Sequence, residues 1–285
     1  FAVQARELTQ SQSILQNQIE KVSDHLFEKG AMVIPGEIGY DLNYYSVKLT
    51  SFTDSAAVGV TLTDFVGLRL TGATSGVTAK VINTDATDGT DPNTLYVKYE
   101  NSGTNNTEVK FTAGETISIA TTLSGTSTTV SAVVNTCHTG AAAYVGAGVY
   151  YINGFHVSVD EQTLILDKYT NTPSYRVGLS VAESFTTPND DTTLNDNATG
   201  TSNVNAPGAH RFKILLTLTK KTLTAVDDAN FVELLRLSNG IIQNQVRTTE
   251  YAVLEDTLAR RTFDESGDYS IRDFDLDLRE HLISG

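Results

Sequence analysis

The spacing of the hydrophobic residues changes once, near residue 30, and this change separates a helical start from a β-rich remainder. Before it, five apolar residues recur at intervals of seven, four, three and four: Leu8, Leu15, Ile19, Val22 and Leu26. That spacing places them on one side of a helix, at the core positions of a heptad repeat. From Ala31 onward the apolar residues alternate with a period of two, which is typical of strands.

The first segment is predicted to be a helix over residues 1–29 that ends at Lys29-Gly30, because glycine favours the left-handed position after a helix. Gln12 takes the remaining core-facing position of the heptad pattern. The helix can pack on its own domain, or its five apolar residues can form an oligomer interface with other copies. About three heptads are marginal for an isolated coiled coil, so such a bundle needs support from the rest of the chain.

Several later segments carry strand and hairpin signals. Asn153-Gly154 lies between alternating apolar runs, and this dipeptide favours a type I′ hairpin turn. Asn239-Gly240 indicates a second hairpin, with a helix over 228–237 as the alternative. Further segments are predicted as strands at 44–49, 163–169, 175–183, 211–223 and 268–280, and as a helix at 249–261.

Residues 51–140 differ in composition, because they are dense in Thr, Ser, Gly, Asn and Asp with short β-branched runs between. Residues 65–81 and 111–130 resemble each other, since each reads as a strand, a Ser-Gly turn and a strand. Two copies do not make a solenoid. We interpret them as paired hairpins of a small β-barrel or sandwich inserted into the main domain.

These observations predict a mainly β chain with an N-terminal α-helix, sandwich- or barrel-like β-domains, an inserted small β-domain and a short C-terminal helix. The predicted organisation has three parts. They are an N-terminal helix for oligomerisation or attachment at 1–30, a main β-rich domain at 31–50 and 141–285, and the insertion at 51–140. The chain starts at Phe1 without Met, so we expect it to be the ordered part of a longer polypeptide.

Charge and cysteine content limit the classes of partner. The formal net charge is −14, and no Lys/Arg cluster interrupts the acidic surface, so binding to nucleic acid or to an anionic membrane is disfavoured. No apolar run approaches the roughly 20 residues of a membrane-spanning helix. Cys137 is the only cysteine, so no disulfide can form within the chain.

No arrangement of residues indicates catalysis or metal binding. The five histidines lack ligand spacing, and Cys137-His138 are adjacent and would need distant partners to bind zinc. Asp85, Asp88 and Asp91 lie in a polar loop that lacks the EF-hand pattern, so we interpret it as a turn rather than a cation site. We predict a non-enzyme without cofactor or metal.

The last predicted strand offers one further set of carboxylates. Asp273, Asp275 and Asp277 fall on one face of it, opposite Phe274 and Leu276. Paired carboxylates can serve glycoside hydrolysis, but that chemistry needs a cleft and unequal pKa values. A half-buried strand with a solvated side explains the pattern without chemistry.

Three blocks of the sequence carry a family resemblance. QARELTQSQSILQNQIE with EKGAMVIPGEIGYD (4–20 and 28–41), NAPGAHRFKILLTL (205–218) and LEDTLARRTFDESGDYSIRDFDL (254–276) look like segments of tail proteins from contractile-tailed bacteriophages, especially those of cyanobacteria. The segment at 51–140 lies outside these blocks. The resemblance implies a virion structural protein of the baseplate or fibre-attachment region, without known catalytic residues.

The expected function is therefore a phage-tail component that assembles by protein–protein contacts, as a homotrimer and with other tail, baseplate or fibre proteins. One alternative is a receptor-binding tail-fibre module, in which exposed Tyr96 and Tyr99 would bind host glycans, although both tyrosines also suit packing within a hairpin. Another is a polysaccharide-degrading enzyme that would use Asp275.

Overall fold

The fold is mainly β, as the periodicity predicts. The computed structural model describes residues 5–34, 36–52, 60–104, 106–123, 126–195, 206, 208, 210–226, 228–246 and 251–268. It is 51% strand and 17% helix, with several antiparallel sheets between an N-terminal and a short C-terminal helix. Contact clustering divides the chain into two compact units: residues 1–31, 151–155 and 249–285, and residues 32–150 and 156–248.

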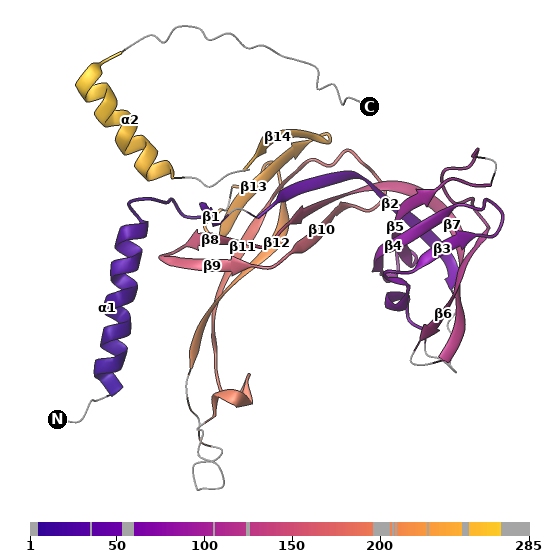
Figure 1. Ribbon diagram of the computed structural model, residues 1–285, viewed down its shortest axis with the longest axis horizontal. Coiled ribbons are helices and arrows are strands. Elements are labelled where there is room, and N and C mark those ends of the chain that lie inside the picture. The colour runs from indigo at the N-terminus through magenta and orange to yellow at the C-terminus, as the bar shows by residue number, and fades with distance from the viewer. Residues whose placement is uncertain are drawn as a thin grey trace, which may run out of the picture. The chain divides into compact units, whose positions relative to one another are not determined.

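Along the chain, one α-helix precedes the strands and another follows them (Figure 1). The elements that the following paragraphs use have these bounds: α1 Ala5–Ser23, β1 Met32–Ile34, β2 Ile38–Phe52, β3 Arg69–Gly72, β4 Thr78–Asp85, β5 Thr94–Asn101, β6 Thr116–Leu123, β7 Thr126–Val145, β8 Gly148–Ile152, β9 Phe155–Val159, β10 Gln162–Asp167, β11 Tyr175–Thr186, β12 Arg211–Thr222, β13 Phe231–Ser238, β14 Ile241–Gln245 and α2 Ala252–Ser266.

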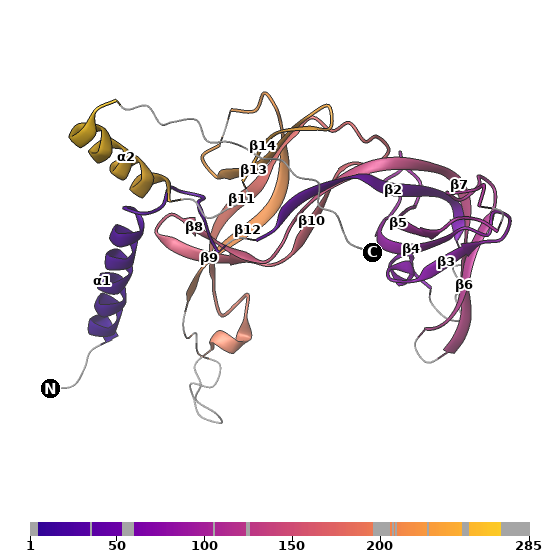
Figure 2. The same cartoon turned by 45° about the horizontal axis from the view of Figure 1, so that its top comes forward.

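The second unit contains a closed barrel. Its seven-stranded sheet has the order β10-β7-β2-β5-β4-β3-β6, and β6 also pairs with β7, so six of the strands form a ring. The long strands β2 and β7 run on beyond the ring, where β7 also pairs with β10 (Figures 1 and 2). A closed sheet leaves no exposed edge between its strands.

The two similar segments form adjacent hairpins of this barrel. The first is β3–β4 and the second is β6–β7, and β3 pairs with β6 through Thr71 and Ser118. The predicted paired hairpins are therefore present.

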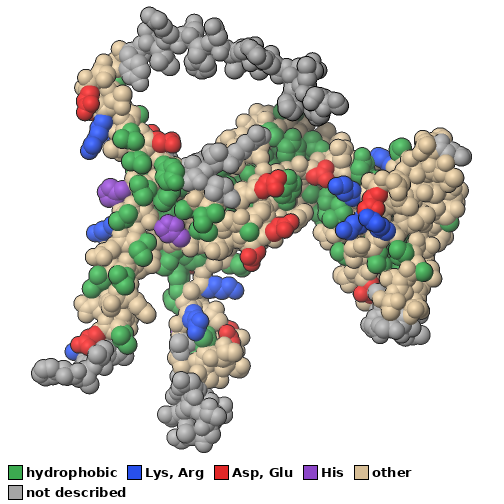
Figure 3. All heavy atoms as spheres, viewed as in Figure 1, with side chains coloured by type: hydrophobic (Ala, Val, Ile, Leu, Met, Phe, Trp, Pro, Cys, Tyr) green, Lys and Arg blue, Asp and Glu red, His purple; other side chains and the backbone are tan. Residues whose placement is uncertain are grey.

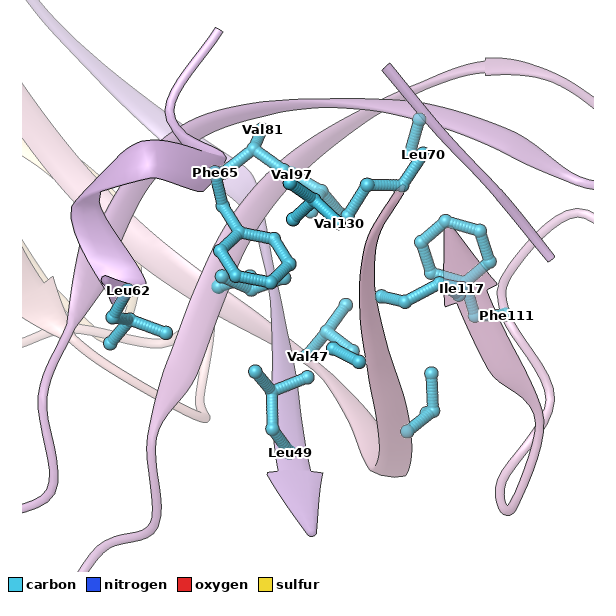
Figure 4. Packing of buried hydrophobic residues seen from close by; sticks show 14 of the residues in the cluster. Val47, Leu49, Leu62, Phe65, Leu70, Val81, Val97, Phe111, Ile117 and Val130 are labelled. Carbon is cyan, nitrogen blue, oxygen red and sulfur yellow. The ribbon is translucent and has the colours of Figure 1, made fainter. Parts of the chain in front are cut away.

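One hydrophobic cluster fills the barrel. Its side chains come from every strand of the ring, and the side chains of Phe65, Leu70 and Ile117 are among its fully buried members (Figure 4). Buried and exposed residues alternate along the strands, and the buried ones form this core. In β4, for example, Ala79 and Val81 are buried while Lys80 is exposed. The buried members of this core lie between Val47 and Val134, a range that overlaps most of the predicted insertion at 51–140.

Glu115 joins the two hairpins from inside. It is only 4% exposed, and its carboxylate accepts hydrogen bonds from the backbone N–H groups of Thr74, Ser75 and Thr112 and from the Ser75 hydroxyl. Burial alone would raise the pKa of this carboxyl, but the four hydrogen bonds outweigh it and hold the pKa below its usual value. One side chain therefore fixes two turns that are about 40 residues apart.

A separate four-stranded sheet has the order β12-β11-β13-β14. Asn239 and Gly240 both have positive φ, as a type I′ turn requires, and they connect β13 to β14. The hairpin interpretation is confirmed, and the alternative helix over 228–237 is wrong. Asn153-Gly154 has the same geometry between β8 and β9, which form a three-stranded sheet with β1.

Some predicted bounds differ from those observed. The strand predicted at 44–49 extends over 38–52, and the helix predicted at 249–261 lies at 252–266. The boundaries predicted at 51 and 140 fall inside β2 and β7, so the three-part division stays a prediction. The strand predicted at 268–280 lies almost wholly outside the described residues.

Candidate interaction surface

The apolar stripe of α1 is exposed to solvent. Four of the five predicted interface residues lie on this helix, and their side chains are between 49% and 65% exposed: Leu8 62%, Leu15 57%, Ile19 49% and Val22 65%. Heptad positions on one side of a helix are normally covered, since burying such a side chain contributes about 1.5–3 kcal/mol. Within the described residues, these four side chains have no such cover.

A different face of α1 holds the helix in its own unit. The Gln16 side chain donates a hydrogen bond to the carbonyl oxygen of Gly154 (2.8 Å). Glu20 packs so close to Gly154 that a Cβ added there would lie 2.9 Å from Glu20 Cγ. At 3.6 residues per turn, the face of Gln16, Glu20 and Ser23 lies about 90° around the helix from the apolar stripe. Because the intramolecular contact uses polar positions, the stripe is left uncovered.

The end of α1 is fixed by aromatic residues. The Phe27 ring lies 5.9 Å from that of Tyr151 and 5.4 Å from that of Tyr251, between ring centroids. The Tyr151 hydroxyl donates to Asp24 Oδ1 (2.5 Å), and burial together with this acceptor raises the pKa of Tyr151. We call Phe27, Tyr151 and Tyr251 the aromatic junction. It anchors the start of α2 beside the end of α1.

The helix is shorter at its end than the sequence predicts. It ends at Ser23, and Leu26, the fifth predicted interface residue, lies in the following turn and is half-buried. The expected end at Lys29-Gly30 is therefore wrong. Phe27 N–H still donates to Ser23 O, but the chain then turns so that Phe27 is buried in the aromatic junction. Tertiary packing of one aromatic residue decides the end of the helix.

The second helix also exposes apolar residues. Leu258 and Phe263 in α2 are 53% and 57% exposed, and Leu254 is also exposed. Figure 3 shows hydrophobic side chains on the surface of both helices. No helix of the described residues is both long and apolar enough to span a membrane.

The three aspartates of the acidic loop contact a lysine side chain from another part of the chain. Lys168 Nζ lies 2.7 Å from Asp85 Oδ2, 3.6 Å from Asp88 Oδ2 and 3.7 Å from Asp91 Oδ2. The hydrogen bond to Asp85 raises the pKa of Lys168. Backbone N–H groups of Asp91 and Thr90 hold the pKa of Asp88 below its usual value. The three carboxylates thus converge on an ammonium group of the chain.

The other candidate residues do not come together. The Cys137 thiol donates to the carbonyl oxygen of Phe111 (3.4 Å). The His138 side chain lies on the other face of β7, where its ring is tilted against that of Tyr169 at 5.2 Å between centroids. No group of three or more potential metal ligands occurs in the part of the chain that the structure describes. Asp273, Asp275 and Asp277 lie outside the described residues.

The two tyrosines considered for glycan binding are packed. Tyr96 is fully buried and stacks on Tyr44 at 5.0 Å between ring centroids. Tyr99 is half-buried between Tyr45 and Phe111, and burial raises its pKa strongly. Both tyrosines pack against other aromatic rings, so the packing interpretation is confirmed for both residues.

The comparisons with known proteins give a family without a known activity. Residues 99–284 match the model of the family described as "Domain of unknown function (DUF4815)". Neither the curated proteins nor the solved structures contain a match.

Proposed function

Because the chain belongs to the DUF4815 family, which carries no described activity, we propose its function from its surface: a structural component of a phage tail, in the baseplate or fibre-attachment region. It assembles through protein–protein contacts and performs no catalysis. The supporting observation is the exposed stripe on α1, formed by Leu8, Leu15, Ile19 and Val22. The resemblance of three sequence blocks to tail proteins supplies the biological setting.

The stripe favours other helices as its partner. Heptad spacing is the pattern with which helices pack against helices, and a surface that repeats along α1 suits identical copies. Burying four apolar side chains per chain contributes several kcal/mol at about 25 cal/mol per Å². We propose a homotrimer, in which three α1 helices cover each other's stripes.

The rest of the first unit stabilises α1, which a short helical bundle alone would hold only weakly. A helix such as α1, with 19 residues, gains most of its stability from packing rather than from helix propensity. In this chain, the hydrogen bond from Gln16 to Gly154 and the burial of Phe27 hold α1 in place before association. The ordering cost of assembly is therefore lower than for a free peptide.

Immunogold electron microscopy tests the tail assignment. Antibodies against the purified chain are applied to intact virions of the phage that encodes it. Label at the baseplate end or at the fibre attachment supports the proposal. Label on the capsid, or no label on virions while the chain is abundant in infected cells, contradicts it. A glycan-array screen of the full chain tests the receptor-binding alternative. That alternative predicts that the chain binds specific glycans and that this binding does not depend on the α1 stripe.

A further inference from the structure

Strand β2 separates from β5 at one end of the barrel, and a gap opens between them. Their ladder stops at the pair Tyr45–Val97, although both strands continue. Asn43 lies where the next hydrogen-bonded pair of the ladder would form, but its N–H donates instead to Asp41 Oδ1 (2.7 Å). Figures 1 and 2 show β2 running on beyond the ring. The end of the ladder therefore leaves room between the two strands.

The gap is a cavity of about 250 Å³ with a mixed lining. Asp41 and Asn43 are exposed polar residues at its edge, and Ile82, 42% exposed, adds an apolar side chain. Because Asp41 is held through Oδ1, its Oδ2 is positioned as a second acceptor. A cavity just below the roughly 300–1,000 Å³ of drug-sized ligand sites suits a smaller group, such as one sugar ring. We call this cavity the notch, and it is lined by Asp41, Asn43, Tyr45, Ile82, Val97, Lys98 and Tyr99.

The strand register places three cations in one row beside the notch. Arg69 pairs with Lys80 across β3 and β4, and Lys80 pairs with Lys98 across β4 and β5. Directly opposite side chains have Cβ atoms about 5 Å apart and lie on the same face of a sheet. The neighbours of Lys80 in β4, Ala79 and Val81, are buried in the barrel, so the row lies on its outer face. The three residues are far apart in the sequence, and only the pairing brings them together.

Two of these cations have no charged partner within the described residues. Glu100 Oε2 lies 2.8 Å from Arg69 Nε, so Arg69 is neutralised. No ion pair of the described residues involves Lys80 or Lys98. Like charges directly opposite each other destabilise a sheet, and the chain as a whole has a formal net charge of −14. An anion bound between the two lysines would relieve their repulsion.

We propose that the notch and the two lysines beside it bind an acidic carbohydrate, such as a chain of uronic acid residues. One sugar ring enters the notch, where a hydroxyl donates to Asp41 Oδ2 and the C–H face of the ring contacts Ile82. A carboxylate of the sugar chain pairs with Lys98, which lines the notch, and with Lys80. This is a function beyond assembly, and it does not depend on whether copies of the chain associate.

The Asp41 carboxylate favours a sugar over other anions. A simple phosphate at neutral pH or a nucleic-acid backbone would bring negative charge next to this carboxylate, and a phosphodiester has no hydroxyl to donate to it. A uronic acid carries both groups, because its ring hydroxyls donate while its carboxylate accepts from lysine. The combination of one acceptor and two cations therefore selects a ligand with hydroxyls and a negative charge.

Isothermal titration calorimetry of the full chain tests the site. The probe is a galacturonic acid trisaccharide at pH 7 and low salt, and uncharged maltotriose is the control sugar. We expect the acidic trisaccharide to bind and maltotriose to bind at least about tenfold more weakly. Absence of binding by the acidic trisaccharide at millimolar concentration, or equal binding of the two sugars, would overturn the inference. A single-stranded oligonucleotide that binds more tightly than the trisaccharide would overturn it in favour of nucleic acid.

Substitutions separate a built site from adsorption to positive charge. Lys80→Gln with Lys98→Gln should weaken binding at least about tenfold, whereas Lys21→Gln with Lys213→Gln, which removes two exposed lysines outside the barrel, leaves it unchanged. Loss of a negative charge strengthens adsorption of an anion, but Asp41→Ala also removes the acceptor for the sugar hydroxyl and should weaken binding at least about fivefold. Tighter binding by Asp41→Ala, or an unchanged affinity of the Lys80 and Lys98 variant, would overturn the proposal.

Discussion

The carboxylate of Glu115 receives two hydrogen bonds from one residue, Ser75, through its backbone N–H (2.9 Å) and its hydroxyl (2.9 Å). Ser75 lies in the turn between β3 and β4, whereas Glu115 precedes β6. The contact therefore connects the turn between β3 and β4 to the turn that precedes β6, and the stability of the barrel should depend on the charge of one buried side chain.

We expect Glu115→Gln to lower the free energy of unfolding by about 2 kcal/mol, since an amide offers one acceptor oxygen where the carboxylate offers two. Urea titration followed by circular dichroism measures the loss. Glu108→Gln changes an exposed carboxylate of the same barrel and should cost less than about 0.5 kcal/mol. Equal effects of the two substitutions would show that Glu115 does not fix the turns.

The same side chain predicts a dependence on pH. The folded pKa of Glu115 lies below its usual value of 4.5, so its contribution is fully present above that value. The contribution decreases as the pH falls below 4.5 and is lost once the pH has passed the lower folded pKa. Denaturation at pH 3 to 6 should therefore show a steeper acid loss for the native chain than for Glu115→Gln. Parallel curves would contradict this assignment.

Arg176 provides a second buried contact that can be measured. It is 6% exposed, pairs with Glu233 and Asp228, and donates to the carbonyl oxygen of Ala225 (2.6 Å). Lysine keeps the charge but cannot reach all these acceptors, so Arg176→Lys should cost about 2 kcal/mol. Arg69→Lys is the control, because Arg69 forms an exposed pair with Glu100 that contributes less than about 1 kcal/mol. A smaller loss at Arg176 than at Arg69 would contradict the role of this network.

Cys137 should react slowly in the folded chain. Its thiol is half-buried beside Tyr99 and Phe111, and burial raises its pKa above the usual 9.0. Because the thiolate is the reactive form, alkylation at pH 8 should be at least about tenfold slower than in the urea-unfolded chain. Mass spectrometry of iodoacetamide-treated samples measures both rates. Similar rates in the two states would show that the thiol is open to solvent.

Much of the β architecture could be predicted from local sequence. The Asn-Gly turns at 153–154 and 239–240 and the repeated strand–turn–strand pattern fix hairpins between neighbouring segments. Closure of the barrel could not be predicted, because it depends on pairing between β3 and β6 and between β2 and β7 across long stretches of chain. Local patterns carry no information on such register.

The interaction surface could be predicted in part. Heptad spacing identified the stripe of α1, but not the end of the helix at Ser23, because that end depends on packing of Phe27 against Tyr151 and Tyr251. The extension of β11 and β12 beyond β13 could not be predicted from sequence. RFKILL reads as an ordinary strand, and only the pairing shows that β13 stops short of its outer half.

Sedimentation velocity of the full chain at micromolar concentration tests the α1 stripe most directly. We predict a trimer for the native chain and a folded monomer for Leu15→Asp with Ile19→Asp, because charges on the stripe cannot be buried between helices. Gln10→Asp with Asn17→Asp adds the same charge to exposed positions away from the stripe and should remain trimeric. A native chain that sediments as a stable folded monomer, or a stripe variant that remains trimeric, would contradict the account.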